Sequence, residues 1–175
     1  IVGEDVYGGV YRLFEKVKRK FNIEFSYVNA AKPEEIEAAI KPNTKLVWLE
    51  TPTNPLLKLA DLAAVGKITK KHKLLFAVDN TFATPLLQQP IALGADFEIN
   101  SSTKYLNGHG TGVSGIVIGA DAAFMEKHLW KIRKLHGTIV APFDAWMLNL
   151  GMKTLNLRMK AHCENAMKVA TFLSQ

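Results

Sequence analysis

Residues 45–79 read KLVWLETPTNPLLKLADLAAVGKITKKHKLLFAVD, and this stretch holds the repeating unit of the predicted fold. Its two apolar runs, Lys45–Glu50 and Leu74–Val78, have the length and aliphatic content of buried strands. Between them we predict a helix over Asp61–His72, with Asp61 as the N-cap because an Asp side chain can accept from the free N–H groups of a first turn. Apolar strands separated by a helix indicate a parallel sheet.

The same alternation extends along most of the chain. Further buried strands are predicted at residues 97–100 and 113–118, an alternating strand at 23–28, and helices at 8–20, 33–40 and 121–135, the last with Asp121 as N-cap. This pattern indicates an α/β fold with a mostly parallel sheet covered by helices on both faces. We assign residues 1–140 to this α/β domain.

Beyond Pro142 only helical patterns follow. Apolar residues recur at spacings of three and four between Leu155 and Leu173, which predicts a long helix with one apolar stripe. We assign residues 141–175 to a helical segment that leads toward a C-terminal domain. Because the chain begins without Met and ends inside this helical pattern, we expect it to be a central piece of a longer protein.

Composition excludes several classes of protein. The chain has 175 residues, of which 48% are hydrophobic and 22% charged, as in ordinary globular proteins. No run approaches the roughly 20 apolar residues of a spanning helix, and no secretory signal is present at the start. The one cysteine, Cys163, fits a reducing compartment. We therefore predict a cytoplasmic location and no membrane partner.

The net charge of +6 raises the question of nucleic acid. The basic residues cluster within predicted helices, at 12–20, 67–73 and 127–134, where solvated helix faces usually carry them. Zinc-finger spacing and RNA-binding aromatic motifs are both missing, so nucleic acid is only a weak alternative and is not predicted as a partner. The five histidines show no ligand spacing, so no metal site is predicted.

Polar side chains follow three successive predicted strands. Glu50–Asn54 comes after the first, Asp79 after the second, and Ser101–Lys104 after the third. Ligands of an open parallel sheet bind beyond the carboxyl ends of its strands, so these groups would converge on one crevice if the strands are neighbours. A lysine amine, a carboxylate and hydroxyls are the groups that pyridoxal phosphate chemistry needs for the aldehyde, the pyridine nitrogen and the phosphate.

Several motifs in register resemble one family. They are AVDNTFATP at 77–85, PIALGAD at 90–96, SSTKYLNGH at 101–109, ETPTNP at 50–55 and DVYGG at 5–9, with KTL and RM at 153–155 and 158–159. Together they resemble the transsulfuration, or Cys/Met metabolism, family of pyridoxal phosphate-dependent enzymes over essentially the whole chain. The resemblance implies a fold type I transferase-like domain, pyridoxal 5'-phosphate as cofactor and a sulfur amino acid as substrate. It also implies a homotetramer, a dimer of dimers with shared active sites.

The resemblance also implies residue roles. Lys104 is expected to hold the cofactor as a Schiff base, and Asp79 to pair with the pyridinium nitrogen. Ser101 and Thr103 resemble the phosphate-binding hydroxyls. The remaining two site residues are Asn54, beside the phenolic oxygen of the ring, and Tyr7, which would stack on the ring and assist the leaving group. Lys104 and Tyr7 are thus the expected catalytic residues.

The resemblance leaves the reaction open. It implies γ-elimination, as in cystathionine or methionine γ-lyase, with γ-replacement, as in cystathionine γ-synthase or O-acetylhomoserine sulfhydrylase, as the alternative. Gly108–Thr111 reads GHGT where family members commonly have Gly-His-Ser-Asp, and Ser102 replaces a frequent Ala. A non-catalytic scaffold is the more distant alternative. The glycine-rich phosphate loop and the arginine for the substrate carboxylate are expected outside this stretch.

One motif points elsewhere and is rejected. GTGVSG at 110–115 matches the dinucleotide fingerprint G-x-G-x-x-G. That fingerprint must open a helix, whereas these glycines lead into a predicted strand. The motif therefore predicts no dinucleotide site.

Overall fold

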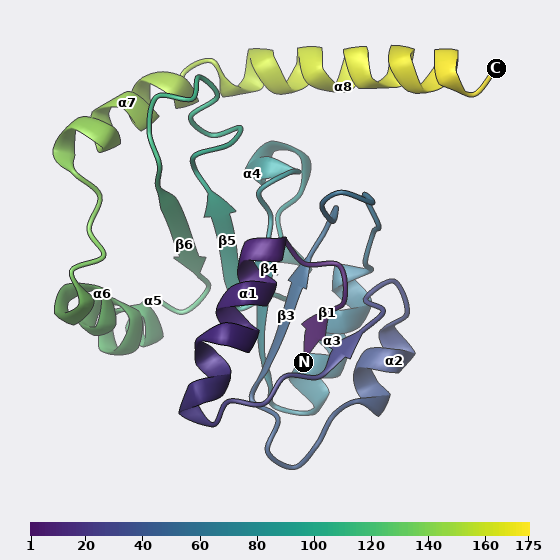
Figure 1. Cartoon of the computed structure of the whole chain (residues 1–175), viewed down its shortest axis with the longest axis vertical. Coiled ribbons are helices and arrows are strands. Elements are labelled where there is room, and N and C mark those ends of the chain that lie inside the picture. Colours follow the sequence, from purple (N-terminus) through teal and green to yellow (C-terminus); the bar gives the residue numbers. More distant parts are fainter.

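The computed structural model describes the whole chain, Ile1–Gln175. At its centre lies a six-stranded sheet with the order β2-β1-β3-β4-β5-β6 (Figure 1). The strands are β1 (Val2–Gly3), β2 (Tyr27–Val28), β3 (Leu46–Glu50), β4 (Leu75–Asp79), β5 (Phe97–Ser101) and β6 (Gly115–Gly119). All neighbouring strands run parallel except β5 and β6, which are antiparallel. The prediction of a mostly parallel sheet is confirmed.

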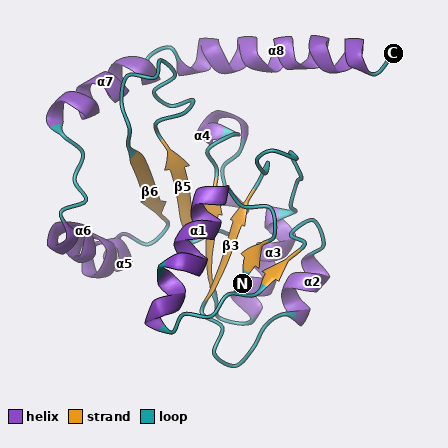
Figure 2. Ribbon diagram, in the orientation of Figure 1, coloured by secondary structure: helices purple, strands orange, loops and turns teal.

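Helices connect the strands from β1 to β5 and continue the chain after β6 (Figure 2). They are α1 (Gly8–Lys16), η1 (Lys18–Phe21), α2 (Pro33–Ala38), α3 (Leu62–Lys71), α4 (Thr84–Leu87), η2 (Ile91–Leu93), α5 (Ala122–Phe124), η3 (Met125–Trp130), α6 (Lys131–His136), α7 (Pro142–Met152) and α8 (Leu155–Leu173). Both predicted N-caps are present. Asp61 accepts from Ala64 N–H at 2.9 Å, and Asp121 accepts from Phe124 N–H at 3.0 Å.

The apolar core lies between β3, β4 and the helices on one face of the sheet. It consists of Ile36, Val47, Leu49, Leu62, Val65, Phe76, Val78 and Ala95. Because side chains alternate along a strand, Trp48 faces the other way, where its ring meets Phe14 of α1 edge-on with centroids 5.7 Å apart. In Figure 1 α1 accordingly lies in front of the sheet and α3 behind it. Helices thus cover both faces, as predicted.

The observed strands differ from the predicted ones. The strand at 23–28 is reduced to β2, and β1 was not predicted because a two-residue strand has no readable alternation. The strand at 113–118 is β6, and the prediction that it is buried is wrong, since Val117 and Ile118 are 46% and 39% exposed. Residues 102–114 contain no helix to carry the chain back across the sheet, so β6 returns beside β5 in the antiparallel direction.

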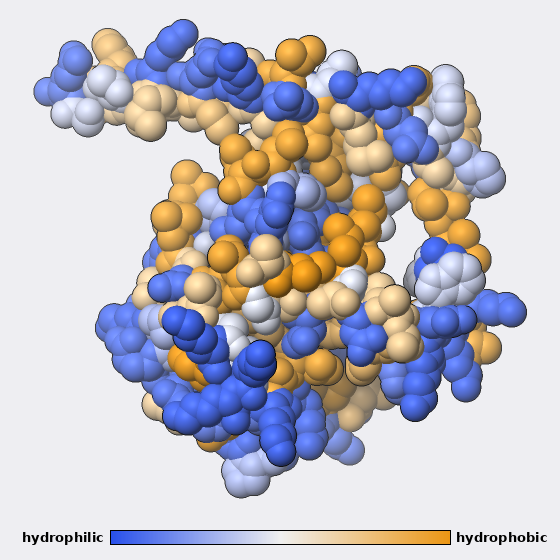
Figure 3. All heavy atoms as spheres, turned by 180° about the vertical axis from the view of Figure 1, so that it is seen from behind, coloured by the Kyte–Doolittle hydropathy of each residue, from blue (hydrophilic) through white to orange (hydrophobic).

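The last two helices form an arm. After α7, helix α8 projects away from the sheet (Figure 1). Met159 near its start is buried, whereas Phe172 near its end is 73% exposed. Seen from behind, apolar atoms lie at the surface where this arm meets the body (Figure 3). The domain boundary after residue 140 stays a prediction. None of the helices is both long and apolar enough to cross a membrane.

Candidate functional site

A cavity of 280 Å³ opens at the carboxyl ends of β3, β4 and β5. Its walls are formed by Tyr7, Glu50, Pro52, Asn54, Asp79, Thr81, Phe82, Ser101, Thr103, Lys104 and Val113. Every residue predicted for the site is among them. The strands are neighbours in the sheet, so residues that are far apart in the sequence meet at one edge, as the rule for open parallel sheets requires.

A larger hollow of 570 Å³ lies at the opposite edge, near the starts of β1 and β3. It is lined by Ile1, Val2, Phe14, Lys18, Asn22, Ile23, Glu24, Phe25, Ser26, Lys41, Asn43, Thr44, Lys45, Leu46 and Trp48. Size alone would favour this hollow as a binding site. However, sites of parallel α/β sheets form at the carboxyl ends of the strands, and the predicted chemistry is gathered there.

Asp79 is the last residue of β4, and Thr81 fixes the orientation of its carboxylate. Asp79 Oδ1 accepts from Thr81 N–H at 3.0 Å and from Thr81 Oγ1 at 2.6 Å. Both bonds engage the same oxygen, so Oδ2 keeps its lone pairs for a cation in the cavity. Thr81 was not predicted as a site residue. The available signal was the Asp-x-Thr spacing, which favours a side-chain turn of this kind.

The two predicted phosphate hydroxyls differ in their surroundings. Ser101 N–H donates to Thr81 Oγ1 at 2.8 Å, and the Ser101 hydroxyl itself makes no protein hydrogen bond. Thr103 Oγ1 accepts from Ser114 N–H at 3.0 Å and donates to Ser114 O at 3.2 Å. An anion could therefore accept from Ser101 directly, whereas Thr103 would have to give up a long bond to the β5–β6 loop.

Lys104 stands on a turn directly after β5. Lys104 N–H donates to Ser101 O at 3.1 Å, and Gly108 N–H donates to Lys104 O at 2.8 Å, so two bonds close the turn around it. The Lys104 side chain is exposed to the cavity, and its amine forms no ion pair with any acid of the chain. A free amine on a fixed turn is suited to react with an aldehyde.

Arg158 of α8 supports this turn from outside the cavity. Its guanidinium donates to Tyr105 O at 2.7 Å and to Gly151 O at 2.9 Å, with a longer bond of 3.4 Å to Leu106 O. The Arg158 side chain also fills the space into which a side chain at Gly108 would project, and Gly108 has a φ of +76°, which favours glycine. Arg158, which belongs to one of the motifs that resemble the family, therefore holds the arm against the loop that carries Lys104.

Tyr7 and Asn54 are held by the carboxylate of Glu50. Glu50 Oε2 accepts from Tyr7 N–H at 2.7 Å, and Oε1 accepts from Asn54 N–H at 3.0 Å. Burial, reinforced by the negative charge of Asp79, raises the pKa of Glu50 to about 7. Glu50 was noted at a strand end but not predicted as a site residue, because its bonds go to backbone groups that no sequence motif reveals.

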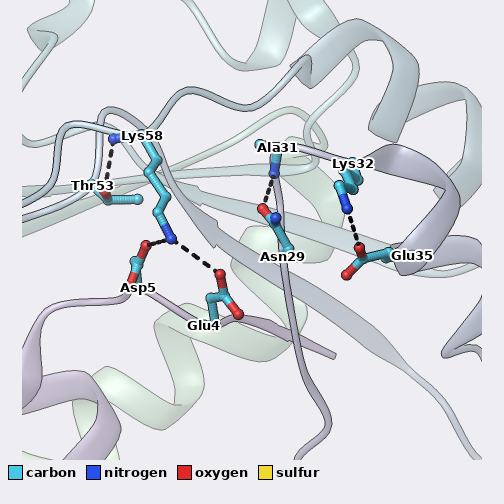
Figure 4. A network of polar contacts seen from close by, with 8 residues as sticks. All are labelled: Glu4, Asp5, Asn29, Ala31, Lys32, Glu35, Thr53 and Lys58. Atoms are coloured by element: carbon cyan, nitrogen blue, oxygen red, sulfur yellow. Dashed lines mark hydrogen bonds and ion pairs between the residues drawn. The ribbon is translucent and has the colours of Figure 1, made fainter.

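Lys58 ties the same two loops together on the outer side (Figure 4). Its ammonium lies 2.5 Å from Asp5 and 3.1 Å from Glu4, both in the loop that precedes Tyr7, while its backbone N–H donates to Thr53 Oγ1 at 3.0 Å. These groups are partly exposed, so the ion pairs add little to stability. Their effect is to keep the loop of Tyr7 against the loop of Asn54.

Comparison with known proteins identifies the family. A family model described as "Cys/Met metabolism PLP-dependent enzyme" matches residues 1–175. The chain belongs to this family. A probable cystathionine γ-synthase of Herpetosiphon aurantiacus is 46% identical over 175 residues, which make up 100% of this chain and 54% of that relative. A cystathionine β-lyase of Coxiella burnetii is 43% identical over 176 positions, covering 100% of this chain and 46% of the relative.

A solved structure of the same family shares the fold. The crystal structure of cystathionine γ-lyase from Lactobacillus plantarum complexed with L-serine matches with a TM-score of 0.97 and 45% identity, covering 99% of this chain and 45% of that chain. The predicted family and the fold type I architecture are thus confirmed. The chain spans about half the length of the relatives that it matches.

The donor set of the cavity fits the family's cofactor, pyridoxal phosphate. Lys104 offers an amine without an ion-pair partner, Asp79 a free carboxylate oxygen, and Ser101 a hydroxyl without a protein partner. No cluster of three or more His, Cys, Asp or Glu side chains in the chain could hold a metal ion. The residues at the three strand ends therefore match an aldehyde, a protonated ring nitrogen and a phosphate better than a metal ion.

Proposed function

We propose that this chain forms the cofactor-binding part of a pyridoxal phosphate-dependent enzyme that eliminates the γ-substituent of a sulfur amino acid. One observation carries the proposal. The amine of Lys104 and the free oxygen of Asp79 line the same cavity, and neither is engaged by another group of the chain. These are the two groups that the family's chemistry requires of the protein, a nucleophilic amine and a charge partner for the ring.

Each cavity residue has a proposed task. When bound, pyridoxal phosphate supplies an aldehyde that joins amines and a ring that draws electrons from the substrate's α-carbon. Lys104 would first anchor the cofactor and then, once freed, remove the α-proton of the substrate as a general base. Asp79 Oδ2 would keep the ring nitrogen protonated. Ser101 and Thr103 would bind the phosphate.

Tyr7 and Asn54 complete the wall of the cavity. Tyr7 is 52% exposed, so its ring is available to stack on a bound aromatic group and its hydroxyl can donate a proton to a leaving sulfur. The amide of Asn54 would hydrogen-bond the phenolic oxygen of the cofactor. With Lys104 as the base and Tyr7 as the acid, the cavity has the groups needed to remove one proton and to deliver another during γ-elimination.

γ-Replacement is the second candidate, and the relative described as a probable cystathionine γ-synthase favours it. Both reactions begin with the same α-proton removal by Lys104. They differ in whether the site then admits a second nucleophile, and the residues around the cavity are equally suited to both outcomes.

The oligomeric state and the cellular location of the protein are also part of the proposal. Trp130, Phe143 and Trp146 are more than half exposed on the helices after β6. Exposed aromatic residues of this kind support the proposal that copies of the protein associate, as a homotetramer with shared active sites. A cytoplasmic location remains part of the proposal.

Product analysis tests the reaction. The full-length protein containing this chain, loaded with pyridoxal phosphate, is incubated with L-cystathionine, and the keto acid is identified by chromatography. γ-Elimination gives cysteine, ammonia and 2-oxobutyrate, whereas β-elimination gives homocysteine, ammonia and pyruvate. Formation of cystathionine from cysteine and an O-acylated homoserine, without 2-oxobutyrate release, would favour γ-replacement. Absence of all these products in a protein that still binds the cofactor would favour the scaffold alternative.

A further inference from the structure

Glu50 joins two loops that approach the cavity from different parts of the chain. It ends β3, and only 7% of its surface is exposed. One carboxylate oxygen accepts from Tyr7 N–H at 2.7 Å, in the loop between β1 and α1. The other accepts from Asn54 N–H at 3.0 Å, in the loop between β3 and α3. Both oxygens are thus used, each on a different loop.

The bond to Tyr7 also serves helix α1. Tyr7 is the N-cap residue of α1, yet its own side chain makes no capping bond, and the first turn contains no acidic residue. A helix N-terminus carries partial positive charge and is stabilised by a nearby anion. The Glu50 carboxylate supplies that anion from a neighbouring strand. The position of Tyr7 therefore depends on a charge that its own helix does not provide.

A second carboxylate lies beside Glu50. Glu50 and Asp79 are register partners in the parallel pair β3–β4. Burial is the main cause of the raised pKa of Glu50, about 7, and the charge of Asp79 raises it further, while the N–H groups of Tyr7 and Asn54 oppose the shift. Other titratable groups lie near Glu50. Tyr7 and Lys104 line the cavity with it, and Glu4, Asp5 and Lys58 line a second, small pocket on the outer side that Glu50 also borders.

We propose that Glu50 is a positioning residue whose ionised carboxylate sets the spacing between Tyr7 and Asn54, and that its ionisation is coupled to cofactor binding beside Asp79. The proposal rests on the proposed function, in which the cavity holds pyridoxal phosphate. A carboxylate can accept both N–H groups at once. A protonated Glu50, or a glutamine, has one oxygen that accepts and one polar group that donates, so one of the two N–H groups would face another donor.

The coupling follows from the charge of Asp79. A protonated ring nitrogen bound at Asp79 Oδ2 would offset the negative charge that disfavours ionisation of Glu50. Glu50 should then ionise at lower pH in the loaded protein than in the apoprotein. By linkage, binding near neutral pH would release protons from Glu50, and binding would tighten as the pH rises through the range in which Glu50 of the apoprotein titrates.

The test observes the two N–H groups directly. The full-length apoprotein is labelled with ¹⁵N in tyrosine and asparagine, and the amide shifts of Tyr7 and Asn54 are followed by NMR between pH 5 and 9. We expect the two amide shifts to titrate with one shared midpoint near pH 7. When pyridoxal phosphate is added, this shared midpoint should fall to a lower pH. The Asp79→Asn apoprotein should also show a lower midpoint, because the neighbouring charge is gone.

Glu50→Gln is the decisive variant, and Glu98→Gln is its matched control. Glu98 is equally buried, on strand β5 of the same sheet, but accepts from Asn80 and Asn100 side chains and does not line the cavity. The shared transition should vanish in Glu50→Gln and persist in Glu98→Gln. Failure of either variant to fold leaves the wild-type and Asp79→Asn titrations to decide.

The outcomes separate this proposal from the proposed function. Separate midpoints for Tyr7 and Asn54, no transition, or a transition that survives Glu50→Gln would overturn the positioning role. A shared transition that cofactor binding or Asp79→Asn leaves unmoved would overturn the coupling. Neither measurement needs turnover, so a protein that shows the transition and its shift yet forms none of the expected products would fail only as the proposed enzyme.

Discussion

The hydroxyl of Thr81 lies between two site residues, donating to Asp79 Oδ1 at 2.6 Å and accepting from Ser101 N–H at 2.8 Å. One side chain thus orients the carboxylate proposed for the ring nitrogen and the start of the segment proposed for the phosphate. Since β4 and β5 are adjacent in the sheet, this bridge fixes the ends of both strands relative to each other. The distance between the two binding groups is therefore set by Thr81.

Replacement of Thr81 should lower activity without unfolding the protein. Thr81→Val keeps the shape of the side chain but removes the hydroxyl, so Asp79 loses a bond and Ser101 N–H loses its acceptor. A hydrogen bond to a charged group is worth roughly 1.5–3 kcal/mol, so we expect kcat/KM to fall at least about tenfold. Steady-state keto acid formation measures the loss. Thr81→Ser, which keeps the hydroxyl, should remain close to wild type, and equal losses in both variants would contradict the role of the bridge.

Asp79→Asn should damage catalysis far more than folding. The amide oxygen can still accept from Thr81, so the turn after β4 should survive, while the charge for the ring nitrogen is lost. Charge stabilisation of this kind is typically worth about 3–4 kcal/mol, or roughly a hundred- to a thousandfold in rate. Turnover and thermal unfolding of the same preparation measure the two effects. Turnover within about threefold of wild type, less than ~1 kcal/mol, would make Asp79 a turn former only.

Borohydride reduction should attach the cofactor irreversibly to Lys104. The amine of Lys104 stands free on its turn, whereas Lys58 is paired with Asp5 and Glu4. Peptide mapping of the reduced, cofactor-loaded protein identifies the modified residue. Label on Lys58, Lys153 or any other lysine would show that the site assignment is wrong.

The sequence predicts secondary structure best where the residue pattern of a single element determines it. The apolar runs at Lys45–Glu50 and Leu74–Val78 became β3 and β4, because their side chains pack into the core on one face of the sheet and, at Trp48, against Phe14 of α1 on the other. The meeting of Asp79 and Lys104 in one cavity was predictable for a related reason, since parallel order alone places the ends of neighbouring strands together.

What the sequence did not reveal depends on contacts between distant backbone groups. Glu50 binds the N–H groups of Tyr7 and Asn54, and a backbone N–H leaves no mark on residue type. The direction of β6 depends on how residues 102–114 turn, which no periodicity encodes. The predicted roles of the site residues remain proposals that the variants described here can test.

Gly151→Ala should destabilise the protein, although alanine normally favours a helix over glycine by about 1 kcal/mol. Gly151 lies in α7, and a Cβ at this position would overlap the carbonyl of Asn107, in the loop after Lys104. Asn149→Ala, at an exposed position of the same helix, is the control and should be neutral or stabilising. Denaturant unfolding compares the two variants. A Gly151→Ala protein as stable as wild type would mean that α7 does not rest on the Lys104 loop as the structure has it.

The raised pKa of Glu50 predicts how stability changes with pH. Between pH 4.5, the ordinary pKa of a glutamate, and about pH 7, the pKa of Glu50 in the folded apoprotein, the folded protein binds more protons than the unfolded chain. The contribution of Glu50 to the free energy of unfolding therefore falls as the pH rises through this range. Each pKa unit corresponds to 1.36 kcal/mol, so the loss approaches about 3 kcal/mol and is complete above about pH 7. Glu50→Gln cannot ionise and should lack this slope, whatever constant cost its altered hydrogen bonds add.

Urea unfolding of both apoproteins at pH 5, 6, 7 and 8 gives the difference in stability between wild type and Glu50→Gln at each pH. We expect the wild type to lose stability relative to the variant up to about pH 7 and then to run parallel to it, and curves that stay parallel from pH 5 onward would place the ionisation of Glu50 outside this range.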